Sequence, residues 1–228
     1  LLAARQAKKL VEMIDFENAK DKVLMGVERR SLIISEEEKR TIAYHEAGHA
    51  LVAHMLPHAD PVHKVSIVAR GGMGGYTRLL SEDRYLMTKS QFNDTLATLL
   101  AGHTAEEMIF GEVSTGPHSD IKQATELARK MVTQYGMSEL SLRTFGGKEE
   151  GTYVSGPEQR DYSEEMARKI DEEVHKLIES AHEVARTVLT ENRRRLVHLA
   201  KKLITFETLE GASLEAAFTE PVTEVTPV

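Results

Sequence analysis

Residues 35–57 carry the strongest structural signal in this chain of 228 residues. Ser35 followed by Glu38 matches a capping box, in which two side chains satisfy backbone groups at the start of a helix. Residues at helical spacing then form one face, and Pro57 stops the helix because it lacks a backbone N–H. The pattern predicts a helix from Ser35 to Pro57 with an inner face of Ile42, His45, His49, Val52 and Leu56.

Five consecutive residues of this helix, His45-Glu46-Ala47-Gly48-His49, form a metal-binding pattern. Histidines four residues apart lie on one helix face about 5–6 Å apart, so both imidazoles can reach one zinc ion. Glu46 lies about 100° around the helix from His45, which suits a base beside a metal-bound water better than a ligand. Gly48 is expected to open space beside such a site. The pattern therefore predicts a zinc centre at which Glu46 activates water.

The absence of cysteine restricts every other metal ligand to His, Asp or Glu. A catalytic zinc needs a third protein ligand, and Val52 and Met55 exclude the metzincin pattern, which has Gly and His there. Glu106 lies near the end of a predicted helix. Asp120 lies at a loop-to-helix junction, where with Gln123 it also fits an N-cap pair. Spacing leaves Glu106 and Asp120 open among the candidates His54, His58, His63, Glu82, Asp94, His103, Glu106, Glu107, His118 and Asp120.

The rest of the chain is typical of helices arranged around one small β region. Val65 and Ile67 alternate with polar residues, and a glycine-rich reversal at 71–75 precedes a second short strand at 76–80. We therefore expect a mainly α fold with a small β-hairpin or sheet edge. The expected helices lie at 1–26, 35–57, 88–111, 120–136, 163–189 and around 196–203, with a mobile loop at 140–160 and a frayed tail after Phe218.

Charge and composition exclude several classes of function. The net charge of −7 lacks the basic footprint of a nucleic-acid-binding domain, so we expect no nucleic-acid partner. No segment approaches the ~20 consecutive apolar residues that span a bilayer, and no glycine-rich loop ends in Gly-Lys-Ser/Thr as a P-loop does. The chain also starts at Leu1 without an initiator Met. We expect a soluble protein or a soluble piece of a larger one.

Five runs extend the histidine pattern along the chain, and they are Ala43–Ala50, Asp60–Val65, Ala105–Glu107, Val113–Gly116 followed by Asp120, and Ala124–Arg129. In this order and spacing they closely resemble the peptidase domain of the FtsH-type AAA+ zinc proteases, and the likeness extends from about Leu1 to Leu209. Some positions differ from the usual pattern. His103 stands where Arg is common, Ala69 replaces a frequent Pro, and residues 117–119 replace Ala-Ser-Asn. None of these changes removes a proposed ligand.

The resemblance implies a role for each site residue. His45 and His49 would bind one zinc ion per chain, with Asp120 as the third ligand. Glu46 would be the catalytic base that activates water for attack on a peptide carbonyl. The implied enzyme is a zinc metalloendopeptidase.

The resemblance also implies an arrangement of domains and partners. Residues 1–28 would be the C-terminal end of an AAA+ ATPase lid, residues 29–212 the helical zinc peptidase domain, and residues 213–228 a flexible tail. ATP would act only through the ATPase domain that this chain lacks. The implied assembly is a homo-hexamer that degrades unfolded or membrane polypeptides, with an extended substrate adding as a strand near the site.

The implied location is the cytoplasmic face of a membrane, with the bacterial inner membrane first and an organellar membrane as the alternative. This chain itself is expected to make no membrane contact.

Two other functions compete with the zinc metalloendopeptidase. A catalytically silent module that holds a hexameric ring would suit the long amphipathic helix at 163–189, although most such apolar stripes are core. The presence of His45, Glu46 and His49 argues against silence. An exopeptidase would need a charged pocket for a substrate terminus, which the sequence does not locate.

Overall fold

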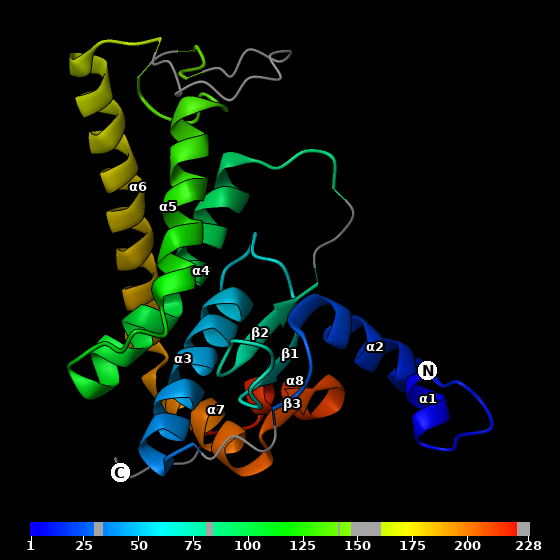
Figure 1. The fold of residues 1–228 in the computed structure, drawn as a ribbon. Helices are drawn as coiled ribbons and strands as arrows, with labels where there is room; N and C mark the ends of the chain where they lie inside the picture. The colour runs from blue at the N-terminus through cyan, green and yellow to red at the C-terminus, as the bar shows by residue number, and fades with distance from the viewer. Residues whose placement is uncertain (30–33, 81–83, 141, 147–160, 223–228) are drawn as a thin grey trace.

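The computed structural model describes residues 1–29, 34–80, 84–140, 142–146 and 161–222 (Figure 1). This part of the chain is mainly helical with one small sheet, so the expected fold class is confirmed. The loop expected at 140–160 lies largely outside the described residues. The helices are α1 (Leu2–Arg5), α2 (Met13–Met25), α3 (Glu36–Met55), α4 (Lys89–Phe110), α5 (His118–Thr133), α6 (Glu164–Glu191), α7 (Arg193–Phe206) and α8 (Gly211–Thr219). The strands are β1 (Val62–Ser66), β2 (Tyr76–Leu79) and β3 (Thr208–Glu210).

Capping residues start the long helices where the sequence predicts. The Ser35 hydroxyl accepts a hydrogen bond from the backbone N–H of Glu38 at 3.1 Å, and α3 begins one residue after Ser35. Thr88 and Gln91 complete a capping box at the start of α4. That helix ends at Gly111, whose φ of +72° lies in the left-handed region that favours glycine. Local hydrogen-bonding chemistry therefore fixes where α3 and α4 begin.

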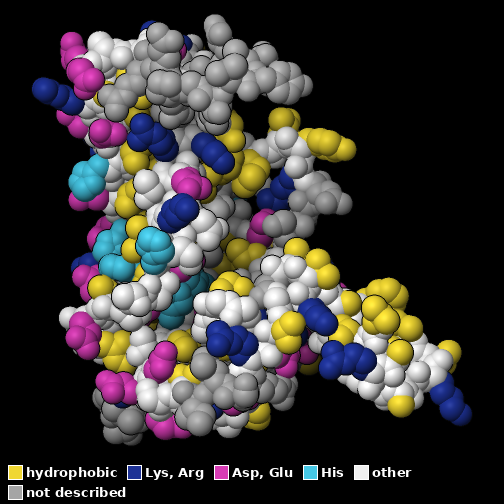
Figure 2. Space-filling view, viewed as in Figure 1, with side chains coloured by type: hydrophobic (Ala, Val, Ile, Leu, Met, Phe, Trp, Pro, Cys, Tyr) yellow, Lys and Arg dark blue, Asp and Glu magenta, His cyan; other side chains and the backbone are white. Residues whose placement is uncertain are grey.

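The N-terminal segment differs from its prediction. The helix expected from residue 1 is broken, because α1 spans four residues and α2 begins only at Met13, although Gly26 ends it as expected. Phe16, Val23 and Leu24 follow helical spacing but are each more than 60% exposed. The segment projects from the rest of the molecule in Figure 1, and hydrophobic side chains cover its surface in Figure 2. The described residues of the chain leave this apolar surface uncovered.

The sheet has the order β2-β1-β3, with both pairings antiparallel. Val65 in β1 pairs with Thr77 in β2, which confirms the expected hairpin. The third strand was not expected. Val65 also pairs with Leu209, and the Ser66 and Thr208 hydroxyls lie 2.7 Å apart. Because β3 has only three residues, it is too short to give an alternating pattern in the sequence.

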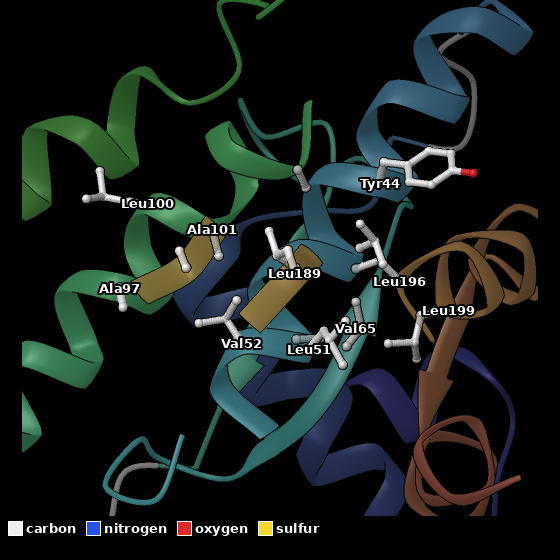
Figure 3. Packing of buried hydrophobic residues seen from close by; sticks show 14 of the residues in the cluster. Tyr44, Leu51, Val52, Val65, Ala97, Leu100, Ala101, Leu189, Leu196 and Leu199 are labelled. Carbon is white, nitrogen blue, oxygen red and sulfur yellow. The ribbon is translucent and has the colours of Figure 1, made fainter. Parts of the chain in front are cut away.

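Helix α3 lies at the centre of the fold and packs against α4, α7 and β1. Leu51, Val52 and Leu196 are buried in this core, as Figure 3 shows. Gly48 is buried as well, and a Cβ there would lie 2.7 Å from the Ala101 carbonyl oxygen of α4. Gly48 therefore allows close contact between α3 and α4 rather than opening space beside the site, as the sequence suggested.

The apolar stripe of the long helix α6 is buried inside the fold. Ile170, Ala181, Ala185 and Leu189 are buried, and α6 packs against α4 and α5 (Figure 1). The stripe is therefore core and does not by itself favour an assembly module. Among the described residues, no helix combines the length and the apolar character that a membrane crossing requires.

The prediction of a flexible tail from residue 213 is wrong for residues 213–219, which are helical. Helix α8 occupies Gly211–Thr219, and its Leu214, Ala217 and Phe218 are buried. The Phe218 ring stacks on the His54 ring with centroids 3.9 Å apart. The apolar residues at 214, 217 and 218 have the i, i+3, i+4 spacing of a core-facing helix, which the sequence interpretation passed over. Residues 223–228 lie outside the described residues.

Candidate metal centre

Three side chains from two helices converge beside the buried half of α3. The Nε2 atoms of His45 and His49 lie 3.0 Å apart. The Oδ2 atom of Asp120, from the first turn of α5, lies 3.3 Å from His45 Nε2 and 3.6 Å from His49 Nε2. One ligand atom of each residue thus faces a common point.

These separations can be compared with what zinc requires. Tetrahedral zinc with ligand distances of about 2.0–2.1 Å separates its ligand atoms by about 3.3 Å. The three observed separations, from 3.0 to 3.6 Å, bracket that value. Two imidazoles and one carboxylate are also a donor set of catalytic zinc sites, which leave a fourth position open. The residues present therefore fit a catalytic zinc ion.

The far side of each imidazole is held by a hydrogen bond. His49 Nδ1 lies 2.7 Å from the backbone oxygen of Thr98, and because a carbonyl only accepts, Nδ1 carries the proton. With the proton on Nδ1, the His49 nitrogen that can bind a metal is Nε2. His45 Nδ1 lies 2.8 Å from Glu106 Oε1, which favours the same tautomer. Both rings are therefore oriented with Nε2 toward the shared point.

Glu106 lies behind His45 and not at the shared point. Its second oxygen accepts a hydrogen bond from the backbone N–H of Ser114 at 2.7 Å. Burial acts to raise the pKa of Glu106, but hydrogen bonds from His45 and Ser114 outweigh it, so the pKa is lowered and the carboxylate is charged. The geometry thus separates the two candidates that spacing left open. Asp120 lies beside both Nε2 atoms, and Glu106 supports one ring from outside.

Asp120 reaches the site from within the first turn of α5 and not from the position before that helix. Helix α5 begins at His118 after Pro117, so Asp120 is the third helical residue and not the N-cap that the alternative interpretation offered. A carboxylate in the first turn is favoured by the helix dipole. Burial acts to raise the pKa of Asp120, but hydrogen bonds to His45 and His49 outweigh it and lower the pKa. The carboxylate is therefore ionised, as a metal ligand must be.

The pKa of His45 reflects the negative charge of the carboxylates around it. Burial acts to lower it, but hydrogen bonds to Asp120 and Glu106 outweigh burial and raise the pKa of His45 to about 10. Two carboxylates around one imidazole therefore attract a cation, which is a proton in the absence of metal. A zinc ion must displace that proton to bind.

Glu46 is buried beside the cluster with its carboxylate against β2. The Thr77 hydroxyl donates to Glu46 Oε2 at 2.7 Å, and the same hydroxyl lies 3.1 Å from the Glu46 backbone oxygen. Burial raises the pKa of Glu46, while the His49 and His45 charges and the Thr77 hydrogen bond act to lower it. A carboxylate with a raised pKa, fixed beside a metal position, suits proton transfer.

Gly102 of α4 forms the floor of the centre. A Cβ at this position would lie 2.4 Å from His45 Cε1 and 2.5 Å from His49 Nε2, far inside ordinary contact. The backbone of α4 therefore approaches both imidazoles at a point where no side chain fits.

The other sequence candidates lie elsewhere. The backbone N–H of His58 donates a hydrogen bond to the Asp94 side chain. His63 Nε2 lies 3.7 Å from Glu17 Oε2, and His118 is exposed. His54 stacks on Phe218, and Glu82 lies outside the described residues. His103 and Glu107 group with His182 of α6, away from the three residues above.

Four contributors to the centre escaped sequence reasoning, and they are Thr77, Thr98, Gly102 and Ser114. Two of them act through backbone groups, which every residue type carries, so no side-chain signal exists to find them. Gly102 was visible only as a glycine inside a predicted helix, a position that usually has a packing or functional reason. Thr77 carried no signal beyond its place in a predicted strand.

Comparison with known proteins adds independent information. A model of peptidase family M41 matches residues 32–217 of the chain. The ATP-dependent zinc metalloprotease FtsH 1 of Sphaerobacter thermophilus is 53% identical over 225 residues, which cover 97% of this chain and 34% of the relative. FtsH 1 of Thermomicrobium roseum gives the same identity and coverage, and FtsH 4 of Sorangium cellulosum is 51% identical over 222 residues, 95% of this chain and 34% of the relative. The chain thus spans about a third of the length of these relatives.

Proposed function

This chain belongs to peptidase family M41, and on that basis we propose that it is the zinc-dependent endopeptidase part of an ATP-dependent protease. The observation that carries the proposal is the convergence of His45 Nε2, His49 Nε2 and Asp120 Oδ2 beside buried Glu46. We propose these three residues as the zinc ligands, with one ion per chain, and Glu46 as the catalytic base.

The chain's own residues divide the work of peptide hydrolysis. When bound, zinc supplies Lewis acidity, which makes water a nucleophile near neutral pH and polarises the peptide carbonyl. Thr77 holds Glu46 through Oε2, which leaves Oε1 to accept the proton of the attacking water and to pass it to the leaving amine. Glu106 and the Thr98 carbonyl keep the two imidazoles aimed at the centre.

Strand β2 is proposed to bind the substrate. It pairs with β1 along one edge, and along its other edge the described residues place no further strand. An extended polypeptide can add to such an edge through backbone hydrogen bonds, which give affinity with little sequence preference. Thr77 lies in β2 and bonds Glu46, so a substrate paired with this strand would pass beside the catalytic base.

We also propose a domain arrangement and an assembly for the whole protein. We propose residues 1–28 as the end of an ATPase lid, because this segment exposes apolar side chains that a larger domain would cover. The proposed whole protein is a homo-hexamer with its own AAA+ ATPase domain, at the cytoplasmic face of a bacterial inner membrane, and its substrates are unfolded or membrane proteins.

Glu46→Gln tests the proposed chemistry. The variant keeps the shape of the side chain and the zinc ligands but cannot accept a proton, so cleavage of a short quenched-fluorescence peptide or of unfolded casein should fall at least ~100-fold. Zinc content, measured by elemental analysis, should equal that of the wild type, because the three proposed ligands are unchanged. Glu36→Gln, an exposed change in the first turn of the same helix, is the matched control and should retain full activity.

Two results would count against the proposal. Undiminished cleavage by Glu46→Gln would exclude Glu46 as the base, and wild-type protein that binds no zinc would exclude the metal centre. Wild-type protein that binds zinc but cleaves neither substrate would favour the silent assembly module.

A further inference from the structure

A second group of metal-ligating side chains lies at the contact between α4 and α6. His103 and Glu107 are four residues apart, so they lie one helical turn from each other on the same face of α4. His182 faces them from α6, and its ring meets the His103 ring at 80° with centroids 5.8 Å apart. The three side chains offer one ligand atom each, all within 4.8 Å of one another.

His182 has an unused nitrogen that points into this group. Its Nε2 is buried and has no hydrogen-bond partner among the described residues. Glu107 Oε2 lies 3.6 Å from it, which is too far for a hydrogen bond. Glu107 already accepts a hydrogen bond from Arg186 at 2.9 Å, so the ion pair on this surface is complete without His182. The histidine nitrogen is therefore left for another partner.

The donor set indicates what that partner is. Two imidazoles and a carboxylate select zinc and similar transition-metal cations, whereas magnesium and calcium prefer oxygen ligands throughout. Around zinc the ligand atoms would lie about 3.3 Å apart, and because the three atoms lie within 4.8 Å of one another, the group must close by at most about 1.5 Å. The Glu107 side chain is 44% exposed and the His182 side chain is 30% exposed, so both side chains lie partly at the surface, where they can move to uncover the buried His182 Nε2.

We propose that His103, Glu107 and His182 form a second, peripheral zinc site that clamps α4 to α6. It shares no residue with the centre at His45, His49 and Asp120. Bound zinc would join two helices that come from distant parts of the chain. Since α4 also carries Gly102 and Glu106, the clamp would fix the helix that supports the catalytic imidazoles from outside.

Equilibrium dialysis of the whole chain against micromolar zinc, followed by elemental analysis, tests the proposal. The wild type should retain about two ions per chain and His182→Ala about one, because only the peripheral site loses a ligand. His175→Ala is the matched control. His175 lies on the same helix, is 71% exposed and pairs with Glu179 outside the group, so this variant should retain both ions.

A second variant guards against misfolding. Glu107→Gln keeps the size of the side chain while removing the charge of the ligand. It should lower the affinity for the second zinc ion at least ~tenfold. Zinc beyond the first equivalent should raise the melting temperature of the wild type but not of His182→Ala or Glu107→Gln. A wild type that retains only one ion overturns the proposal. So does a second ion that survives both substitutions, or one that His175→Ala removes equally well.

Discussion

Replacing Gly102 with alanine is the sharpest test of how the centre is built, because sequence and structure predict opposite outcomes. In a helix interior alanine is more favourable than glycine by about 1 kcal/mol, so propensity alone predicts a more stable protein. In the structure, the new Cβ would lie 2.4 Å from His45 Cε1, 2.5 Å from His49 Nε2 and 2.6 Å from His45 Nδ1. We therefore expect Gly102→Ala to damage the metal centre.

The size of the effect follows from the displacement that the methyl group forces. Ordinary van der Waals contact begins at 3.4 Å, so the closest ring atom must move by about 3.4 − 2.4 = 1.0 Å. Zinc–ligand distances tolerate only about 0.2 Å. A misplacement of about 1 Å costs on the order of 100-fold, or about 2.7 kcal/mol. Zinc affinity and peptide cleavage should both fall by about this factor.

Competition with a chromophoric chelator measures the zinc affinity, and cleavage of the quenched peptide measures the activity. Gly72→Ala is the control, because a Cβ at residue 72 meets no atom within 4 Å, and it should leave both values unchanged. Gly48→Ala clashes with the Ala101 carbonyl of α4 but contacts no proposed ligand, so its main effect should be a lower melting temperature. If Gly102→Ala binds zinc within about threefold of the wild type, the contact geometry argued above is wrong.

Three further outcomes are expected. Glu106→Gln should weaken zinc binding at the centre of His45, His49 and Asp120 by about 10–100-fold while leaving the zinc content at saturation equal to that of the wild type, as titration with the chelator can show; complete loss of that site would make Glu106 a ligand. Thr77→Val removes a hydrogen bond that lowers the pKa of Glu46, so that pKa should rise and the acid side of the pH–activity profile should shift to higher pH; an unshifted profile would contradict the role of Thr77. Because the pKa of metal-free His45 is raised from 6.5 to about 10, its charge stabilises the metal-free fold below pH 6.5, and this contribution is lost as pH rises toward 10. Zinc binding at pH 7 should therefore release about one proton, and calorimetry in buffers of different ionisation enthalpy should detect it.

Local patterns predicted a large part of the fold. The capping residues Ser35 and Thr88 located the starts of α3 and α4, and Gly26 and Gly111 located two helix ends, because these effects act within one helical turn. The hairpin of β1 and β2 was also visible, since a glycine-rich reversal joins neighbouring strands.

Features that depend on distant partners were not visible. Strand β3 exists because Leu209 pairs with Val65, and three residues alone have little preference for a strand. Phe16 and Val23 recur at helical spacing but are exposed, because periodicity identifies an apolar face and not the surface that covers it. Helix α8 was taken for tail although Phe218 is buried.

The sequence by itself determined that His45 and His49 share a helix face and that Glu46 stands beside them, because helix geometry repeats over four residues whatever surrounds it. Only the tertiary structure decided between Asp120 and Glu106, since both reach the imidazoles from segments far along the chain. The packing of α4 and α5 against α3 sets which carboxylate faces the Nε2 atoms and which supports His45 from behind. Spacing in the sequence cannot encode that choice, because it depends on where separate helices dock.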